Sequence, residues 1–123
     1  MSTFLQNIGF ASEGLKYFFK SERNGRIQAA IAFAVVALSF YLGLSPLEWC
    51  LVLGCIALVI ALEMVNTSLE RVCTMLSAEF HPMVKIIKDV AAGAVLWAAI
   101  FCVFIGAIVF IPHLLTLFNN ITR

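Results

Sequence analysis

Hydrophobic positions run along the chain in three long blocks, each long enough to cross a lipid bilayer as a helix. The blocks cover about residues 27–44, 47–76 and 88–111. A helix rises about 1.5 Å per residue, so about 20 apolar residues span the hydrocarbon core. The second block is purely apolar over residues 49–62 and then becomes more polar. The pattern predicts an all-α integral membrane protein with three transmembrane helices.

Residues 3–20 follow a different pattern, in which apolar side chains recur at roughly helical spacing among charged ones. The apolar positions are Phe4, Leu5, Ile8, Leu15, Phe18 and Phe19. This spacing predicts an amphipathic helix that lies in the membrane interface, or one that packs on the other three; the two can hold together. The whole chain, 1–123, is expected to form one domain without a cleaved signal peptide.

The basic residues predict the orientation of these helices, because Lys and Arg near span ends stay on the cytoplasmic side. Four precede the first span, none separate the first and second, three separate the second and third, and one follows. In chain order they are Lys16, Lys20, Arg23, Arg26, Arg71, Lys85, Lys88 and Arg123. We therefore expect the N-terminus in the cytoplasm and the C-terminus outside.

Composition agrees with a lipid environment and excludes other classes of protein. Hydrophobic residues make up 63% of the chain and charged residues 12%, with a mean hydropathy of +1.03, so a soluble monomer is excluded. The net charge of +1 favours no nucleic-acid partner. The four cysteines form no C-x-x-C pair, so neither a disulfide nor a zinc site is expected.

Three polar residues lie in the otherwise apolar second span, and their presence requires an explanation. Glu63, Asn66 and Glu70 are three and four positions apart, which places them on one helix face. Glu63 lies roughly 24 Å along a core about 30 Å thick, where a carboxylate is costly. It is thus a candidate general base. The alternative is that Glu63 and Asn66 only hydrogen-bond to neighbouring helices.

Four residues at span ends are expected to gather on one cytoplasmic surface: Glu22, Glu70, Lys88 and Asp89. Carboxylates and phosphate oxygens together bind Mg²⁺, and lysine neutralises phosphate charge, so the group suits a phosphorylated nucleotide. For Lys88 and Asp89 a purely structural role is a strong alternative, since Asp often caps a helix and Lys often anchors a span. His81 by itself is poor support for a metal site.

The sequence strongly resembles the small prokaryotic diacylglycerol kinase and undecaprenol kinase family. The resemblance is carried by EMVNTSLE at residues 63–70, EFH at 79–81 and KDVAAGAVL at 88–96. It extends upstream through residues 14–15 and SERNGR at 21–26, and so covers nearly the whole chain. It implies a homotrimeric enzyme of the prokaryotic cell membrane that transfers the γ-phosphate of ATP to a lipid hydroxyl, with Mg²⁺ as cofactor.

The resemblance also implies roles for individual residues. Glu63 matches the catalytic base and Asn66 its polar partner, Glu22 and Glu70 match the magnesium ligands, and Glu63 with Ala92 matches the lipid site. The nucleotide-contacting positions are Phe10, Glu22, Glu70, Glu79, Phe80, His81, Lys88 and Asp89.

The chain departs from the family pattern in three places. Phe80 and Phe10 stand where tyrosines are often found, so their hydroxyl contacts are lost, and Thr74 stands where the family usually has aspartate. The RNGR and EFHP segments look closer to undecaprenol kinases, so undecaprenol is the preferred acceptor and diacylglycerol the alternative.

Two other functions fit parts of the pattern. A small proton-coupled transporter would use Glu63 as a relay carboxylate, but the polar face is confined to the cytoplasmic half. A scaffold protein without chemistry would leave the grouping of Glu22, Glu70 and Asp89 as coincidence.

Overall fold

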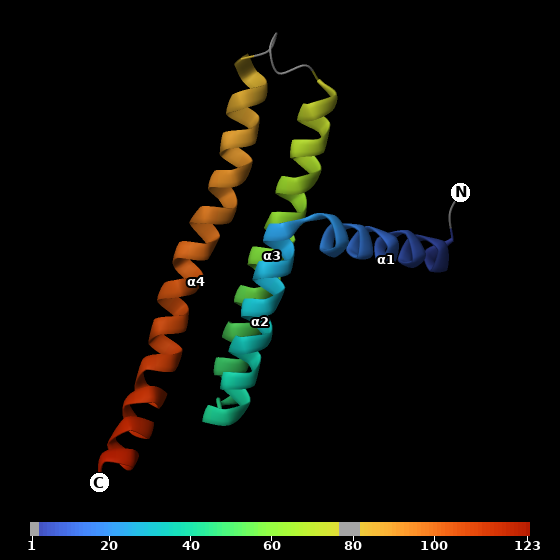
Figure 1. Ribbon diagram of the computed structural model, residues 1–123. Coiled ribbons are helices and arrows are strands. Elements are labelled where there is room, and N and C mark those ends of the chain that lie inside the picture. The colour runs from blue at the N-terminus through green and yellow to red at the C-terminus, as the bar shows by residue number, and fades with distance from the viewer. Residues whose placement is uncertain (1–2, 77–81) are drawn as a thin grey trace.

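The computed structural model describes residues 3–76 and 82–123, which form four helices and no strand. They are α1 (Phe4–Ser21), α2 (Arg23–Leu42), α3 (Pro46–Met75) and α4 (Pro82–Thr122). Helices α2, α3 and α4 run side by side, and α1 projects from them at a steep angle (Figure 1). The predicted all-α class is confirmed, and α2, α3 and α4 are each long and apolar enough to cross a membrane.

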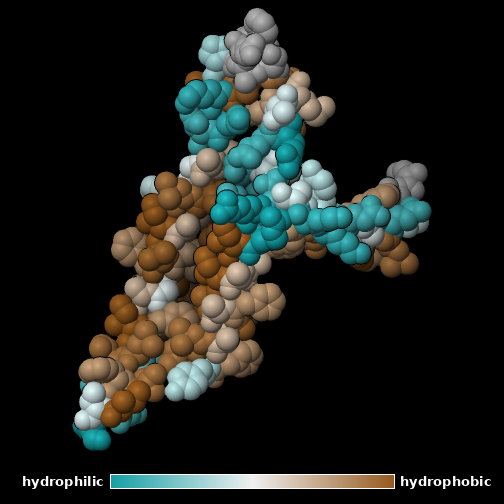
Figure 2. Space-filling model, in the orientation of Figure 1, coloured by the Kyte–Doolittle hydropathy of each residue, from teal (hydrophilic) through white to brown (hydrophobic). Residues whose placement is uncertain are grey.

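Helix α1 begins with a capping box, in which Thr3 and Gln6 exchange side-chain and backbone hydrogen bonds. Most of its apolar residues stay exposed; Phe4 and Leu5 are 77% and 78% exposed, whereas Phe18 near its end is buried. Figure 2 shows hydrophilic residues along one side of α1 and hydrophobic ones below. The helix is amphipathic, as the spacing over residues 3–20 predicts.

A tight turn joins α2 to α3. Gly43 ends α2 in the left-handed conformation, with φ of 70°, which glycine adopts without a steric penalty. Ser45 and Glu48 then form the capping box that starts α3, with Pro46 in its first turn. At this end of the molecule Leu44, Val52 and Val109 form the buried core, so the turn is packed against α4.

Helix α4 differs from its sequence-based boundaries at both ends. It begins at Pro82 and continues through Pro112 to Thr122, beyond the end expected at residue 111. Proline removes one backbone hydrogen bond, but the helix is held on both sides of it. Val109 is buried, and the Nε2 atom of His113 lies 3.1 Å from each carboxylate oxygen of Glu48 on α3.

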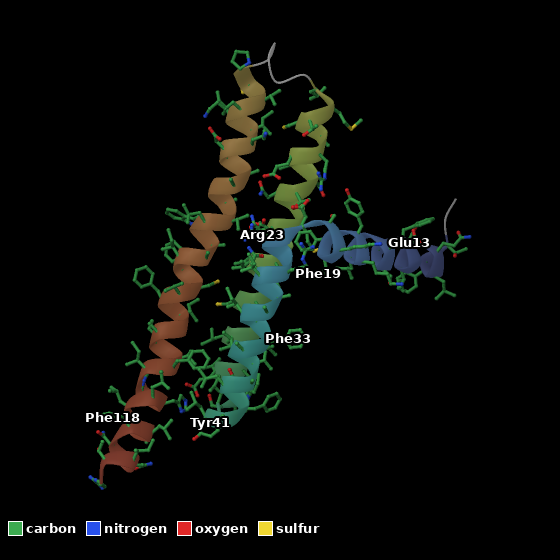
Figure 3. The ribbon with its side chains drawn as sticks, in the orientation of Figure 1. Glu13, Phe19, Arg23, Phe33, Tyr41 and Phe118 are labelled. Atoms are coloured by element: carbon green, nitrogen blue, oxygen red, sulfur yellow. The ribbon has the colours of Figure 1, made fainter. Side chains whose placement is uncertain are left out.

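Most large apolar side chains face outward rather than into a core. Phe33, Trp97, Val103 and Ile108 are between 68% and 79% exposed, and Phe33 points away from α2 in Figure 3. In water such exposure would be unfavourable, since burial is worth about 25 cal/mol per Å². The chain is thus a multi-pass membrane protein, with these side chains facing lipid or other protein.

Candidate active site

The joint between α1 and α2 is built around a close contact. Gly25 is buried against the ring of Phe18, and a Cβ atom there would lie 2.5 Å from its Cε2 atom. The guanidinium of Arg26 donates to the carbonyls of Phe19 and Lys20, at 3.2 and 2.7 Å, and so satisfies the last turn of α1. Glu22 occupies the single position between the two helices, in an extended conformation.

The side chain of Glu22 connects this joint to α3. Its Oε1 atom lies 2.5 Å from Nη2 of Arg71, which directly follows Glu70. The guanidinium of Arg71 also lies 6.0 Å from the centre of the Tyr17 ring on α1. Two carboxylates that are far apart in sequence, Glu22 and Glu70, are therefore brought to the same end of α3.

The polar face of α3 is buried where it enters the apolar part of the molecule. Glu63, Asn66 and Thr67 are 5%, 7% and 6% exposed. Asn66 donates from Nδ2 to Oε1 of Glu70 at 3.3 Å. Its Oδ1 atom is buried and accepts no hydrogen bond from the described residues. Among the residues that the structure describes, no cationic side chain forms an ion pair with Glu63.

The remaining candidates on α1 and α4 lie on the surface of the single chain. Phe10, Lys88, Asp89 and Ala92 are exposed. Lys85 forms an ion pair with Asp89, in which its Nζ atom donates to Oδ2 at 2.6 Å. Within residues 3–76 and 82–123, no hydrogen bond or ion pair joins Lys88 or Asp89 to the carboxylates of α3. These residues are therefore available to a ligand or to another copy of the chain.

Three of the expected nucleotide contacts, Glu79, Phe80 and His81, lie outside the described residues. Thr74, at the position where the resemblance implies an aspartate, is exposed, and its hydroxyl donates to the Glu70 carbonyl at 2.9 Å. That hydrogen bond stays within the helix and gives Thr74 no contact with another element.

Sequence reasoning missed the part played by Arg71 and Tyr17. In the sequence Arg71 stands out only as one of the basic residues that orient the spans. Its position was a usable signal, because it is the only basic residue in α3 and it follows Glu70. Its partner, 49 positions away, had no local signature.

Known proteins resemble this chain over most of its length. Residues 9–110 match the family described as prokaryotic diacylglycerol kinase. The chain is 33% identical over 114 residues to the undecaprenol kinase of Bacillus subtilis (strain 168), covering 93% of each. It is 37% identical over 114 residues to the diacylglycerol kinase of Synechocystis sp. (strain ATCC 27184 / PCC 6803 / Kazusa), covering 92% of this chain and 65% of that longer one. It is 25% identical over 109 residues to the diacylglycerol kinase of Escherichia coli (strain K12), covering 89% of each.

The family match spans most of the chain, and the candidate residues described above lie within the matched range. The two kinds of relative, named undecaprenol kinase and diacylglycerol kinase, both act on membrane lipids by name. The chain therefore belongs to the prokaryotic diacylglycerol kinase family and is a membrane lipid kinase.

Proposed function

We propose that the protein transfers the γ-phosphate of ATP to the hydroxyl of a membrane lipid, with Mg²⁺ as cofactor and undecaprenol as the preferred acceptor. The observation that carries the proposal is the polar face of α3. A buried Glu63 lies two turns below Glu70, and Arg71 draws Glu22 to the same end of the helix. A lipid hydroxyl just below the membrane surface and a nucleotide just above it can meet along this face.

In the proposed reaction Glu63 accepts the proton of the lipid hydroxyl. The hydroxyl oxygen then bonds to the γ-phosphorus while the bond from that phosphorus to the bridging oxygen of ADP breaks, and ADP leaves. Burial supports this role, because it keeps water from competing with the lipid for the phosphoryl group. Asn66 supports it too, since it holds Glu70 in place one turn away. Positioning and charge neutralisation supply most of the catalysis in this kind of transfer.

The donor set fits Mg²⁺ bound together with a nucleotide. Within the described part of the chain no three His, Cys, Asp or Glu side chains gather into a metal site. Two carboxylates, Glu22 and Glu70, suffice when phosphates supply further oxygens, as is usual for Mg²⁺. The buried, unpartnered Oδ1 of Asn66 beside Glu70 is one more hard oxygen atom at this place. When bound, Mg²⁺ would neutralise charge on the transferred phosphate.

The other family positions complete the proposed site. Lys88 supplies positive charge for the phosphates, and Asp89, Phe10 and residues 79–81 contact the nucleotide. Ala92 lies beside the lipid. The surface position of Lys88, Asp89 and Ala92 in the single chain supports a site that closes between subunits of a homotrimer.

The proposed orientation has the N-terminus and the segment between α3 and α4 in the cytoplasm, where ATP is available. Three basic residues at that end of α3 and α4 support it, Arg71, Lys85 and Lys88. Figure 2 shows hydrophilic residues gathered over the same end of the molecule and the joint.

One assay tests the proposal. Purified full-length protein in lipid vesicles receives labelled ATP, Mg²⁺ and either undecaprenol or diacylglycerol. We expect label on both lipids, with the larger kcat/KM for undecaprenol, and label on neither if Mg²⁺ is chelated. Label on neither lipid with Mg²⁺ present contradicts the kinase proposal, and a larger kcat/KM for diacylglycerol contradicts only the choice of acceptor.

Membrane vesicles of known sidedness test the proposed orientation. Inside-out vesicles should use added ATP to phosphorylate the lipid, and right-side-out vesicles should not.

A further inference from the structure

The ion pair between Arg71 and Glu22 occupies a carboxylate that the proposed reaction needs. The Arg71 side chain is 54% exposed and that of Glu22 is 20% exposed, so the pair lies where the joint opens to solvent. The guanidinium is held 2.5 Å from Oε1 of Glu22. Glu22, as a metal ligand, would have to bind a divalent cation while a cationic side chain is held against it.

Two positive charges at one carboxylate repel each other, so binding of a divalent cation at Glu22 weakens the hold of Arg71. A carboxylate has lone pairs for both, but it has only one negative charge to share between them. Binding of metal to the nucleotide-free chain therefore competes with the Arg71 pair.

A released Arg71 has a suitable new partner in the same site. Guanidinium groups bind phosphate through parallel N–H donors, more strongly than neutral donors do. Arg71 follows Glu70, the second proposed magnesium ligand, so a nucleotide held there brings its phosphates within reach of the same side chain. The Tyr17 ring, 6.0 Å away, lies beside the guanidinium on the side of α1 and limits where it can move.

We propose that Arg71 is a nucleotide-binding residue that exchanges partners: it pairs with Glu22 when the site is empty and with the triphosphate when Mg²⁺ and nucleotide are bound. This inference rests on the proposed function. The exchange keeps Glu22 paired and the α1–α2 joint docked on α3 until a nucleotide arrives. It also disfavours metal binding without nucleotide.

The exchange makes two opposite predictions for Arg71→Ala in the full-length protein in lipid nanodiscs. Binding of Mn²⁺ alone, followed by electron paramagnetic resonance, should become about two- to fivefold tighter, because Glu22 loses its competing cation. Binding of a β,γ-imido analogue of ATP with Mg²⁺ should become about tenfold weaker, because a phosphate partner is lost. Arg71→Lys should keep part of the analogue binding, since it retains the charge.

Two further variants serve as controls. Arg23→Ala removes an exposed arginine at the joint and should leave both affinities near those of the unaltered protein (Figure 3). Arg71→Ala combined with Glu22→Gln should lose the gain in Mn²⁺ binding.

If Arg71→Ala weakens both affinities in parallel, Arg71 only holds Glu22 in position. If both affinities are unchanged, the ion pair has no part in binding. Either result overturns the proposed exchange of partners. If the unaltered protein transfers phosphate and Arg71→Ala has the same two affinities as the unaltered protein, this inference alone is rejected. Unaltered protein that neither binds the analogue nor transfers phosphate rejects the proposed function as well.

Discussion

At the residue scale, Glu63 and Glu70 are the same amino acid in different surroundings. Glu63 is 5% exposed and unpaired with any cation of the described residues, whereas Glu70 is half-buried and accepts a hydrogen bond from Asn66. A buried carboxylate without a cationic partner is costly, so Glu63 is a candidate for a functional role. A carboxylate near the surface with a fixed orientation suits a metal and its phosphates.

Replacing Glu63 with Gln tests the first of these roles. The substitution keeps the size and shape of the side chain but removes the proton-accepting carboxylate, so we expect kcat to fall about 100-fold or more. The measurement is lipid phosphorylation at saturating ATP, with helix content checked by circular dichroism. Glu13→Gln, on the exposed surface of α1, should keep turnover near that of the unaltered protein. Full turnover by Glu63→Gln would end its assignment as the base.

At the scale of elements, the joint between α1 and α2 positions Glu22. Phe18 is 3% exposed and packs edge-on against Phe19, with 5.0 Å between ring centroids, so it has little room to yield. Gly25 allows the first turn of α2 to approach that ring. The angle between α1 and α2, visible in Figure 1, therefore depends on the absence of a side chain at Gly25 as well as on the packing of Phe18.

Gly25→Ala should destabilise this joint. The added Cβ would meet Phe18 Cε2 at 2.5 Å, and overpacking of this kind costs about 1–3 kcal/mol, only partly offset by the better helix propensity of alanine. We expect a lower thermal midpoint in lipid and a raised KM for ATP, because Glu22 shifts.

Gly14→Ala on α1 is the matched control. There the new Cβ meets no heavy atom of another element or side chain of the described chain within 4 Å, so stability should stay equal or rise slightly. Combining Gly25→Ala with Phe18→Ala should recover part of the KM change by removing the clash. An unchanged KM and midpoint in Gly25→Ala would show that the contact does not set the position of Glu22.

At the scale of the whole molecule, one chain leaves its site open. The exposed residues on α4 include both site candidates and large apolar side chains such as Trp97 and Phe101. A lipid bilayer can cover the apolar ones, but it cannot bring Lys88 and Asp89 to the carboxylates of α3. In the proposed homotrimer a second copy of the chain would do so.

A homotrimer is the expected state of the purified protein. Native mass spectrometry from a mild detergent should give about three times the chain mass of 13.5 kDa. Dilution of the detergent-solubilised protein should reduce phosphorylation in step with the loss of that species. A species of 13.5 kDa with undiminished activity would contradict both the trimer and a site shared between subunits.

Much of this molecule was predictable from the order of its residues. Length and continuity of the apolar blocks predicted three spans, and the spacing of Glu63, Asn66 and Glu70 predicted the polar face that the structure contains. The end of α4 was not predictable in this way. Proline usually marks a helix end, but here a contact between His113 and Glu48, from a different helix, supports the turn that follows it.

The amino-acid sequence by itself determined the membrane environment, the helices, the family and the face of α3 that carries the polar residues, because each depends on local composition or on spacing along one helix. Tertiary structure alone decided the pairing of Arg71 with Glu22, the contact of Gly25 with Phe18 and the continuation of α4 past Pro112. Each of these depends on how one helix packs against another. Such packing depends on the angle and depth at which helices meet, and no local pattern of residues encodes these.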